Sequence, residues 1–332
     1  MTTQPTLGLP TGDPELEAEI RSGLAAVEGL LLESVKSDYP FVTETSRHLV
    51  EAGGKRFRPL VVLLAAQFGD AHAPGVVPAA VVVELTHLAT LYHDDVMDEA
   101  TLRRGATSAN SRWGNSVAIL TGDFLFARAS DLLADLGPEC VRIQARTFER
   151  LVQGQIRETV GPTEGVDPVD HYIRVLADKT GSLIGTSGRF GAMLSGADES
   201  TTEILARYGE RIGVAFQLAD DILDIASESI QSGKSPGTDL REGVRTLPVL
   251  LALRGTDPES SRLRELLSAP LTDDAQHAEA LQLLRAHPAL EEARQVTREW
   301  AEDARGTLSA LPAGPAKDAL VDLCDLVADR AS

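Results

Sequence analysis

The stretch that decides the fold reads ELTHLATLYHDDVMD over residues 84–98. Its apolar residues recur every three or four positions, which predicts a helix, and the helix ends in a cluster of carboxylates. A second stretch, FQLADDILD over residues 216–224, repeats the Asp-Asp-x-x-Asp pattern inside another apolar helical segment. Two such segments predict an α-helical protein that brings acidic side chains to the edge of its core.

The same periodicity recurs along most of the chain, and alternating strand patterns are rare. Glycine and proline separate the periodic segments, as is typical of helix ends. We expect helices over residues 16–39, 58–68, 79–101, 117–136, 139–160, 169–194, 201–225 and 247–253. Within 169–194 a run of small residues predicts close contact between helices; the run contains Gly185, Ser187, Gly188 and Gly191.

After residue 263 the chain is acidic and amphipathic, with breaks near Pro270, Pro288 and residues 312–315. No long Gly-, Ser- or Pro-rich linker precedes this part, so we interpret it as a peripheral helical layer of the same domain. The sequence therefore predicts a flexible N-terminal tail over residues 1–14 and a single all-helical domain, all-α in class, over residues 15–332.

The composition excludes several classes of protein. With 332 residues, 43% of them hydrophobic, the chain can bury a large core without a disulfide, a structural metal or a partner. The formal net charge of −19 argues against nucleic acid or an anionic membrane surface as a partner. An acidic protein that binds an anionic substrate must concentrate its cations locally or use metal ions.

Three observations bear on location. Residues 1–14 lack the basic and apolar stretches of a secretory signal. The most apolar stretch, residues 76–92, is interrupted by Pro78 and Glu84, so we expect no transmembrane segment. The two cysteines, Cys140 and Cys324, are far apart in the sequence and fit no metal-ligand spacing. A reducing, cytoplasmic location is expected.

The paired aspartate motifs carry most of the functional argument. Residues four apart on a helix lie one turn above each other, so Asp94 and Asp98 share one side of their helix, as do Asp220 and Asp224. Carboxylates at the edge of an apolar region repel one another and lose hydration unless a cation offsets them. Hard oxygen ligands favour Mg²⁺. One such motif alone is better explained as a solvated acidic face; two copies inside apolar helices favour a metal site.

Basic motifs accompany the aspartates. GGKRFRP over residues 53–59 places three positive charges beside two glycines just before a helix, where the backbone and the helix N-terminus suit an anion. The other basic motifs are RRG at 103–105, KTG at 179–181, GK at 233–234 and RTLP at 245–248. Each of these alone is typical of a solvated surface. Together they supply enough positive charge for two diphosphates.

This combination of motifs resembles the trans-isoprenyl diphosphate synthases, the polyprenyl synthetase family, from about residue 53 to residue 248. The resemblance implies antiparallel helices around a deep central cavity, an isoprenoid synthase fold, and a homodimer. It also implies a Mg²⁺-dependent prenyltransferase, with three ions when substrate is bound. Such an enzyme condenses isopentenyl diphosphate with an allylic diphosphate primer into a linear all-trans polyprenyl diphosphate.

The resemblance also implies roles for the matching residues. The metal ligands would be Asp94, Asp98, Asp220 and Asp224, with Asp95 and Asp221 as further candidates. The allylic diphosphate would be neutralised by Arg103, Lys179 and Lys234, and the diphosphate of isopentenyl diphosphate would be bound by Lys55, Arg58, His87 and Arg104. Thr180 and Gln217 would line the reacting carbons. Arg245 stands where the family often has lysine; it keeps the charge and can bind phosphate through two donors.

Helical spacing agrees with two of these roles. His87 lies two turns before Asp94, and Gln217 lies one turn before Asp220 and Asp221. For His87 alone, a histidine of the core would be the simpler interpretation. Its position on the carboxylate face favours a diphosphate contact instead.

Three alternatives remain open. A terpene cyclase also uses an aspartate-rich helix, but its second metal motif would be expected to mix Asn, Ser or Thr with Glu. A head-to-head condensing enzyme of the squalene or phytoene synthase type has less support from the basic motifs. A non-catalytic regulatory subunit of a synthase would be expected to have lost some aspartates or basic residues, and here they are present.

Product length is expected to depend on the helix before the first aspartate motif. Thr90 and Thr86 lie one and two turns before Asp94, with Ala89 beside them. In the family, bulky aromatic residues at positions 89 and 90 give short products. Small residues here favour a medium or long chain, such as a quinone side-chain precursor, over farnesyl or geranylgeranyl diphosphate. Phe148 of a neighbouring helix is a candidate for the cavity floor.

Overall fold

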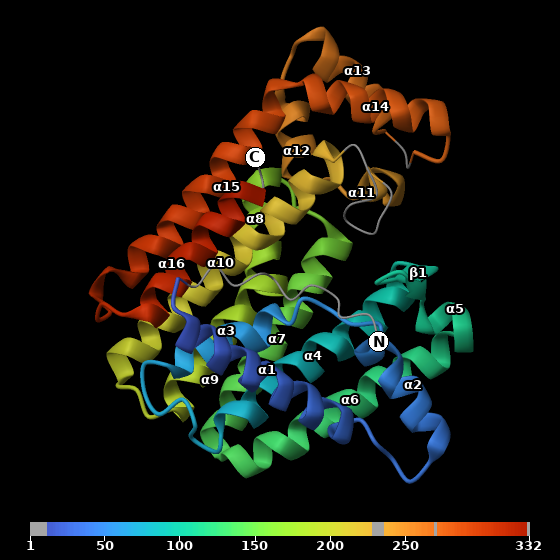
Figure 1. Cartoon of the computed structure of the whole chain (residues 1–332). Helices are drawn as coiled ribbons and strands as arrows, with labels where there is room; N and C mark the ends of the chain where they lie inside the picture. The colour runs from blue at the N-terminus through green and yellow to red at the C-terminus, as the bar shows by residue number, and fades with distance from the viewer. Residues whose placement is uncertain (1–11, 228–235, 269–270, 331–332) are drawn as a thin grey trace. The chain divides into compact units, whose positions relative to one another are not determined.

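The computed structural model describes residues 12–227, 236–268 and 271–330. Helices make up most of these residues (Figure 1). The one sheet within the described ranges is a two-stranded antiparallel hairpin of β1 (Leu102–Arg103) and β2 (Ala106–Thr107). The expected all-α class is confirmed.

The contacts group the chain into two compact units. The first unit comprises residues up to 149, Leu183–Gly209 and Thr307–Leu323. Its elements, besides the hairpin, are α1 (Pro14–Ser34), α2 (Pro40–Glu51), α3 (Phe57–Ala66), α4 (Val76–Met97), α5 (Ala109–Trp113), α6 (Asn115–Leu136), the first part of α7 (Pro138–Val160), most of α9 (Ser182–Leu194), the start of α10 (Glu199–Ala226), η3 (Leu308–Ala310) and the first part of α16 (Pro315–Arg330). The single domain expected over residues 15–332 stays a prediction.

Helix α4 is the central helix of the first unit. It packs against α1, α3 and α6 (Figure 1). Among the described residues, it is the one helix long and apolar enough to cross a membrane, but 67% of its most apolar window is buried inside the protein. Such burial is typical of a core helix, because an apolar surface on all sides needs protein neighbours.

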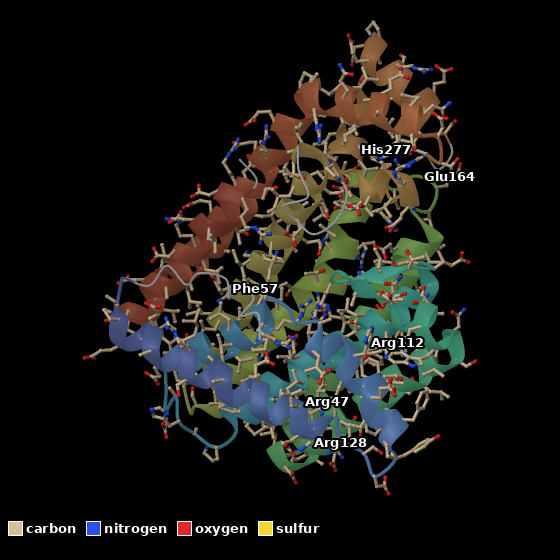
Figure 2. The ribbon with its side chains drawn as sticks, turned by 45° about the vertical axis from the view of Figure 1, so that its right-hand side comes forward. Arg47, Phe57, Arg112, Arg128, Glu164 and His277 are labelled. Atoms are coloured by element: carbon tan, nitrogen blue, oxygen red, sulfur yellow. The ribbon has the colours of Figure 1, made fainter. Side chains whose placement is uncertain are left out.

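The expected helix over residues 16–39 ends earlier in the structure, at Ser34. Asp13 caps the start of α1 by accepting hydrogen bonds from the backbone N–H groups of residues 15 and 16. At the other end, Arg128 of α6 donates to the carbonyl of Ser34 (2.7 Å; Figure 2). A cation there satisfies an open carbonyl and favours the helix C-terminus. Pro40 then begins α2.

The small residues of α9 allow the close contacts that the sequence predicts. A methyl group added at Gly188 would collide with the carbonyl of Leu205, and one added at Gly191 would collide with the carbonyl of Val62 on α3. Only glycine leaves room for these backbones. The prediction of close helix contact is confirmed within the first unit.

The second unit comprises Arg150–Ser182, Glu210–Gly306 and residues from Cys324 onward. Its elements are the second part of α7, α8 (Pro168–Leu176), η1 (Ala177–Gly181), most of α10, α11 (Thr238–Glu242), α12 (Leu247–Arg254), α13 (Pro258–Leu266), α14 (Asp274–Ala286), α15 (Pro288–Thr307) and the end of α16. Helix α12 packs against α8, α13 and α14.

The helix expected over residues 169–194 is interrupted where a basic motif lies. Segment η1 is π-helical and contains Lys179 and Thr180. Such one-turn π segments are rare and concentrate at functional sites. Periodicity alone does not reveal this segment, because the flanking residues continue the helical pattern.

Two further expectations concern helix ends. The helix expected over residues 79–101 begins earlier, at Val76, because Pro78 fits within a first turn. It ends at Met97, and Glu99 adopts φ of +51° just beyond it. Residues 1–11 of the predicted tail and the break near Pro270 lie outside the described residues.

Candidate active site

The first aspartate motif lies at the end of α4 in the first unit. Asp95 is fully buried, and its Oδ1 accepts a hydrogen bond from Arg103 Nε of the hairpin (2.5 Å). Burial raises the pKa of Asp95, and the positive charge of Arg103 opposes that rise. Arg103 Nη2 also lies 4.0 Å from Asp98, whose side chain is 46% exposed. Asp95 therefore anchors Arg103, while Asp98 stays accessible.

The oxygen chemistry of this motif fits a hard divalent cation. Asp94 is partly exposed, and Asp98 follows it by one turn as the C-cap of α4. Among the described residues, Asp95 Oδ2 is a buried atom that has no hydrogen-bond partner. No three histidine, cysteine or carboxylate side chains converge within the described part of the chain. A Mg²⁺ ion fits such a sparse set, because it usually keeps waters and takes substrate phosphates as ligands.

Arg56 and Arg104 hold the basic loop before α3. Arg56 is 7% exposed and adopts φ of +48° as the N-cap of α3. Arg104 donates from Nη1 to the carbonyls of Leu49 (3.2 Å) and Gly53. Its guanidinium carbon lies 2.9 Å from the position that a β-carbon would occupy on Gly54. The loop therefore needs glycine where Arg104 packs against it.

Arg58 and His87 lie in the same positively charged region. Burial lowers the pKa of Arg58 to about 10, although Glu84 raises it. Burial also holds the pKa of His87 well below 6.5, and the charges of Arg58 and Arg104 lower it further. Within the described residues, Arg58 Nε is buried and lacks a hydrogen-bond partner. A region with this excess of positive charge suits an anion. Lys55, from the same loop, is exposed.

The second aspartate motif lies on α10 in the second unit. Asp220 Oδ1 accepts a hydrogen bond from Arg330 Nη2 at the end of α16 (2.6 Å). The guanidinium of Arg330 also lies 5.1 Å from the centroid of the Phe216 ring. A cation other than a metal therefore balances the carboxylate of Asp220 in this structure.

A hydrogen-bonded chain connects Asp221 to the π-helical segment. Tyr172 of α8 donates its hydroxyl to Asp221 Oδ2, and Gln217 Nε2 donates to Asp221 Oδ1 (3.0 Å). Thr180 Oγ1 donates to Gln217 Oε1 (3.5 Å). The structure thus brings together two predicted site residues, Thr180 and Gln217, and orients both through Asp221. Beside them, Lys179 forms an ion pair with Glu158 of α7.

The remaining basic and acidic candidates of the second unit are more dispersed. Asp224 accepts hydrogen bonds from the backbone N–H groups of Thr238 (3.2 Å) and Asp239 (3.1 Å), so it fixes the start of α11. Arg245 donates to the carbonyl of Leu267 (3.2 Å) and lines a cavity of about 470 Å³. Lys234 lies outside the described residues.

The residues expected to set product length occupy different surroundings. Thr86 is fully buried, and its hydroxyl accepts a hydrogen bond from Gln144 Nε2 (2.7 Å). Ala89 is fully buried as well. A β-carbon added to Gly122 of α6 would lie 3.1 Å from the carbonyl oxygen of Ala89, so α4 and α6 are in close contact there. Thr90 is partly exposed, and its hydroxyl donates to the carbonyl of His87 (2.8 Å).

Phe148 lies on α7 and packs against another aromatic ring. Its centroid is 4.4 Å from that of Phe126 on α6, and Phe126 in turn lies 5.9 Å from His93 of α4. These three rings connect α7 through α6 to the helix that carries the first aspartate motif. A role for Phe148 as a cavity floor stays a prediction.

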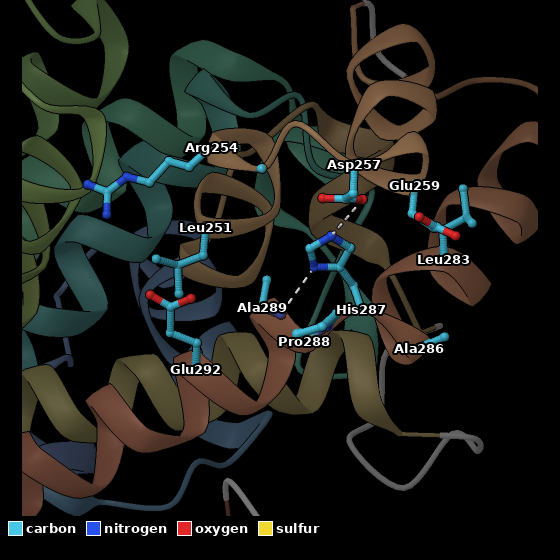
Figure 3. Close-up of a pocket in the computed structure, with 11 residues that line it drawn as sticks. Leu251, Arg254, Asp257, Glu259, Leu283, Ala286, His287, Pro288, Ala289 and Glu292 are labelled. Carbon is cyan, nitrogen blue, oxygen red and sulfur yellow. Dashed lines mark hydrogen bonds and ion pairs between the residues drawn. The ribbon is translucent and has the colours of Figure 1, made fainter.

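A cavity of about 730 Å³ in the second unit is lined in part by Asp257 and His287 (Figure 3). Ser260 of α13 contacts both of these residues. His287 Nδ1 accepts a hydrogen bond from the backbone N–H of Ala289 (3.1 Å), so Nε2 carries the proton. Ser260 Oγ lies 3.0 Å from this Nε2 and donates to Asp257 Oδ2 (2.6 Å). A histidine that donates to the serine cannot take its proton. Asp257 caps α13 and His287 caps α15, and none of the predicted site residues lines the cavity.

Sequence reasoning missed the partners that hold the predicted site residues. Glu84 pairs with Arg56, Tyr172 with Asp221, Glu158 with Lys179 and Arg330 with Asp220. Only Glu84 carried a usable signal: it lies one turn before His87 on the same helix, where a buried acid suggests a cationic neighbour.

The chain is similar to known proteins over almost its whole length. The family model described as polyprenyl synthetase matches residues 39–284. A nonaprenyl diphosphate synthase of Mycobacterium tuberculosis is 52% identical over 324 residues, which cover 97% of this chain and 97% of that relative. A dimethylallyltranstransferase of the same organism is 44% identical over 95% of this chain and 96% of the relative.

A solved structure extends the similarity to three dimensions. Geranylgeranyl pyrophosphate synthase of Corynebacterium glutamicum, complexed with calcium and isoprenyl diphosphate, has 46% sequence identity and a TM-score of 0.87 to this chain. The match covers 97% of this chain and 99% of that one.

Proposed function

The chain belongs to the polyprenyl synthetase family, and we propose that it adds isopentenyl diphosphate to an allylic diphosphate primer in a Mg²⁺-dependent reaction. The product is a linear, all-trans polyprenyl diphosphate. The observation that carries this proposal is the family match over residues 39–284, which includes both aspartate motifs and all five basic motifs. A relative 52% identical over nearly the whole chain is a nonaprenyl diphosphate synthase.

The basic region of the first unit is proposed to bind the diphosphate of isopentenyl diphosphate. Lys55, Arg58 and His87 would contact it, and Arg104 would hold the loop in place as well as contribute charge. The buried, unpartnered Nε of Arg58 supports this assignment, because a buried donor without an acceptor costs free energy that an anion would remove.

The aspartate motifs are proposed to hold Mg²⁺ with the allylic diphosphate, as three ions with substrate bound. Asp94, Asp98, Asp220 and Asp224 are the main ligands in this proposal, with Asp95 and Asp221 as further candidates. Bound Mg²⁺ would stabilise the negative charge of the diphosphate as it leaves. A calcium ion in the similar Corynebacterium glutamicum structure supports a divalent metal here.

Further residues would act on the departing group and the reacting carbons. Arg103, Lys179, Lys234 and Arg245 would add positive charge where the leaving pyrophosphate becomes more negative. Thr180 and Gln217, oriented through Asp221, would lie along the reacting carbons. The carbon–oxygen bond of the allylic diphosphate would break, and the double bond of isopentenyl diphosphate would attack the allylic carbon. The departing pyrophosphate would then take a proton from the carbon next to the new cationic centre, which forms the double bond of the product. Exclusion of water would protect the allylic cation.

We propose a medium- or long-chain product, with geranylgeranyl diphosphate as the second candidate. Small residues at positions 86, 89 and 90 and the nonaprenyl diphosphate synthase relative support the longer product. The name of the similar Corynebacterium glutamicum enzyme favours the twenty-carbon alternative. We also propose a homodimer and a cytoplasmic location; the cysteines Cys140 and Cys324 are both buried and outside any disulfide, which supports a reducing compartment.

The proposal is tested by measuring pyrophosphate release from isopentenyl diphosphate and allylic primers of different lengths, with and without Mg²⁺. Release is expected only with both substrates and Mg²⁺, and Asp94→Ala is expected to lower kcat by about 100-fold or more. Its melting temperature should not fall, because the substitution removes like-charge repulsion. Asp131→Ala, at an exposed carboxylate of α6, is the matched control. No release with any primer would indicate a regulatory subunit instead.

A further inference from the structure

A buried carboxylate that no predicted role uses lies beside the basic loop of the first unit. Glu84 is on α4, and its side chain is 2% exposed. Its Oε1 accepts a hydrogen bond from Arg56 Nη1 (2.9 Å). An acid this deep is costly to bury unless a cation is paired with it, so the contact with Arg56 is a strong constraint on both side chains.

Arg56 transmits this constraint to the loop. Its Nη2 donates to the carbonyl of Val50 at the end of α2 (3.1 Å), and its guanidinium also contacts Glu28 of α1. Its backbone, with φ of +48°, forms the N-cap of α3. Few residues other than glycine adopt this conformation, so it persists only when surrounding contacts hold it. Glu84 and Glu28 are the acids that provide those contacts.

The two acids differ in their access to water. Glu28 is 40% exposed, whereas Glu84 is 2% exposed. Water can replace the contact of Glu28 with Arg56, but it cannot readily replace that of Glu84. Glu84 also offsets the effect of burial on the pKa of Arg58 and of Arg104. One buried carboxylate thus supports three arginines around the loop.

We propose that Glu84 is a positioning residue for the isopentenyl diphosphate site. By holding Arg56, it fixes the backbone of residues 53–58, and with it Lys55 and Arg58, in the arrangement that receives the diphosphate. This inference rests on the proposed function, because Lys55 and Arg58 are assigned to isopentenyl diphosphate there.

Two physical effects of removing the charge of Glu84 have opposite signs. A negative charge near an anion site repels the anion, so its removal alone would tighten binding. Loss of the positioning contact would loosen the loop and weaken binding. The direction of the change in affinity for isopentenyl diphosphate therefore separates a positioning role from a mere charge effect.

The experiment compares Glu84→Gln with the matched control Glu28→Gln. In steady-state kinetics, the Glu84→Gln variant should have a KM for isopentenyl diphosphate about tenfold higher than that of wild type. Its KM for the allylic primer should stay within about twofold of wild type, since that substrate is assigned to other residues. Glu28→Gln should change either constant less than about twofold. Calorimetric titration with isopentenyl diphosphate alone should show the same loss of affinity for Glu84→Gln without turnover.

An unchanged or tighter affinity of Glu84→Gln for isopentenyl diphosphate overturns the inference. So does an equal rise in both KM values together with a lower melting temperature, which indicates a structural role only. If Glu84→Gln does not fold, Glu84→Asp provides the same comparison, since it keeps the negative charge but is one methylene shorter and loses the contact with Arg56 Nη1. A selective rise in the KM for isopentenyl diphosphate then supports positioning, and an unchanged KM overturns it. If wild type itself binds no isopentenyl diphosphate, the proposed function fails rather than this inference.

Discussion

The surroundings of the His87 side chain oppose protonation of its imidazole ring. Burial, and then the charges of Arg58 and Arg104, hold its pKa well below 6.5 in the folded protein. The unfolded chain binds a proton at His87 near pH 6.5, and the folded protein does not, so falling pH favours unfolding. Stability is fully present above about pH 6.5 and is lost below it, by up to about 1.4 kcal/mol per pH unit from this group.

His87→Gln should therefore lose less stability than wild type between pH 6.5 and pH 5. Urea unfolding at a series of pH values measures the difference, and other titrating groups cancel in the comparison. His72→Gln is the control, because the side chain of His72 is 85% exposed. Equal slopes for wild type and His87→Gln would show that His87 is protonated in the folded protein as readily as in the unfolded chain.

Thr90 and Ala89 should respond differently to a bulky substitution, although the sequence predicts the same effect for both. Thr90→Phe should shorten the product toward fifteen to twenty carbons, because Thr90 is partly exposed and can present a ring to a growing chain. Ala89→Phe must enter a fully buried contact near α6 and should lower the free energy of unfolding by about 1–3 kcal/mol.

Mass spectrometry of the products and thermal unfolding provide the two measurements. Thr86→Ser, which keeps the hydroxyl bonded to Gln144, serves as the control for both. A product distribution that Thr90→Phe leaves unchanged, or a wild-type product of twenty carbons, would argue against this helix as the wall that sets chain length.

At the scale of single residues, the sequence could predict candidate side chains but not their partners. Motif spacing identified Asp220 and Asp221 because neighbours on a helix are set by the backbone. Arg330 contacts Asp220 from 110 residues away, and Tyr172 contacts Asp221 from 49 residues away. Such contacts depend on how helices pack, which local periodicity does not specify.

At the scale of helices, periodicity predicted the long helices well but did not predict short elements or interruptions within a helix. Helices α6, α7 and α10 begin and end within two residues of the expected ranges. Helix α2 was not expected, because it contains weak helix formers such as Thr43, Thr45 and Ser46. The hairpin was not expected because two-residue strands are too short to show a period. The π-helical segment η1 was also missed, since it has five residues and continues directly into a helix on each side.

The glycines of two helices provide a test of close packing. Gly191→Ala should lower the free energy of unfolding by about 1–3 kcal/mol, because the added methyl group collides with the carbonyl of Val62. Gly29→Ala on α1 is the matched control: nothing lies within 4 Å of the added methyl group, so it should stabilise by about 0.5–1 kcal/mol. Chemical denaturation measures both. A neutral Gly191→Ala would mean that α9 and α3 can separate at little cost.

At the scale of the whole molecule, two helices expose unusual amounts of apolar surface. Twelve large hydrophobic residues are exposed among the described residues; two lie on α6 and four on α7. Val141, Val152 and Ile156 of α7 share one side of that helix, since eleven residues make about three turns. Exposed apolar residues are common singly, but a row of them along one helix is typical of a protein interface.

We therefore expect the wild-type protein to sediment at about twice the chain mass of 35.4 kDa. The double variant Val152→Glu, Ile156→Glu should sediment as a single chain, because two carboxylates would lose hydration in an apolar interface. Tyr39→Glu, at a residue 62% exposed between α1 and α2, should leave the mass unchanged. Analytical ultracentrifugation at micromolar concentration decides the matter. A wild-type protein of single-chain mass would refute the homodimer, and dissociation of the Tyr39 variant as well would place the interface elsewhere.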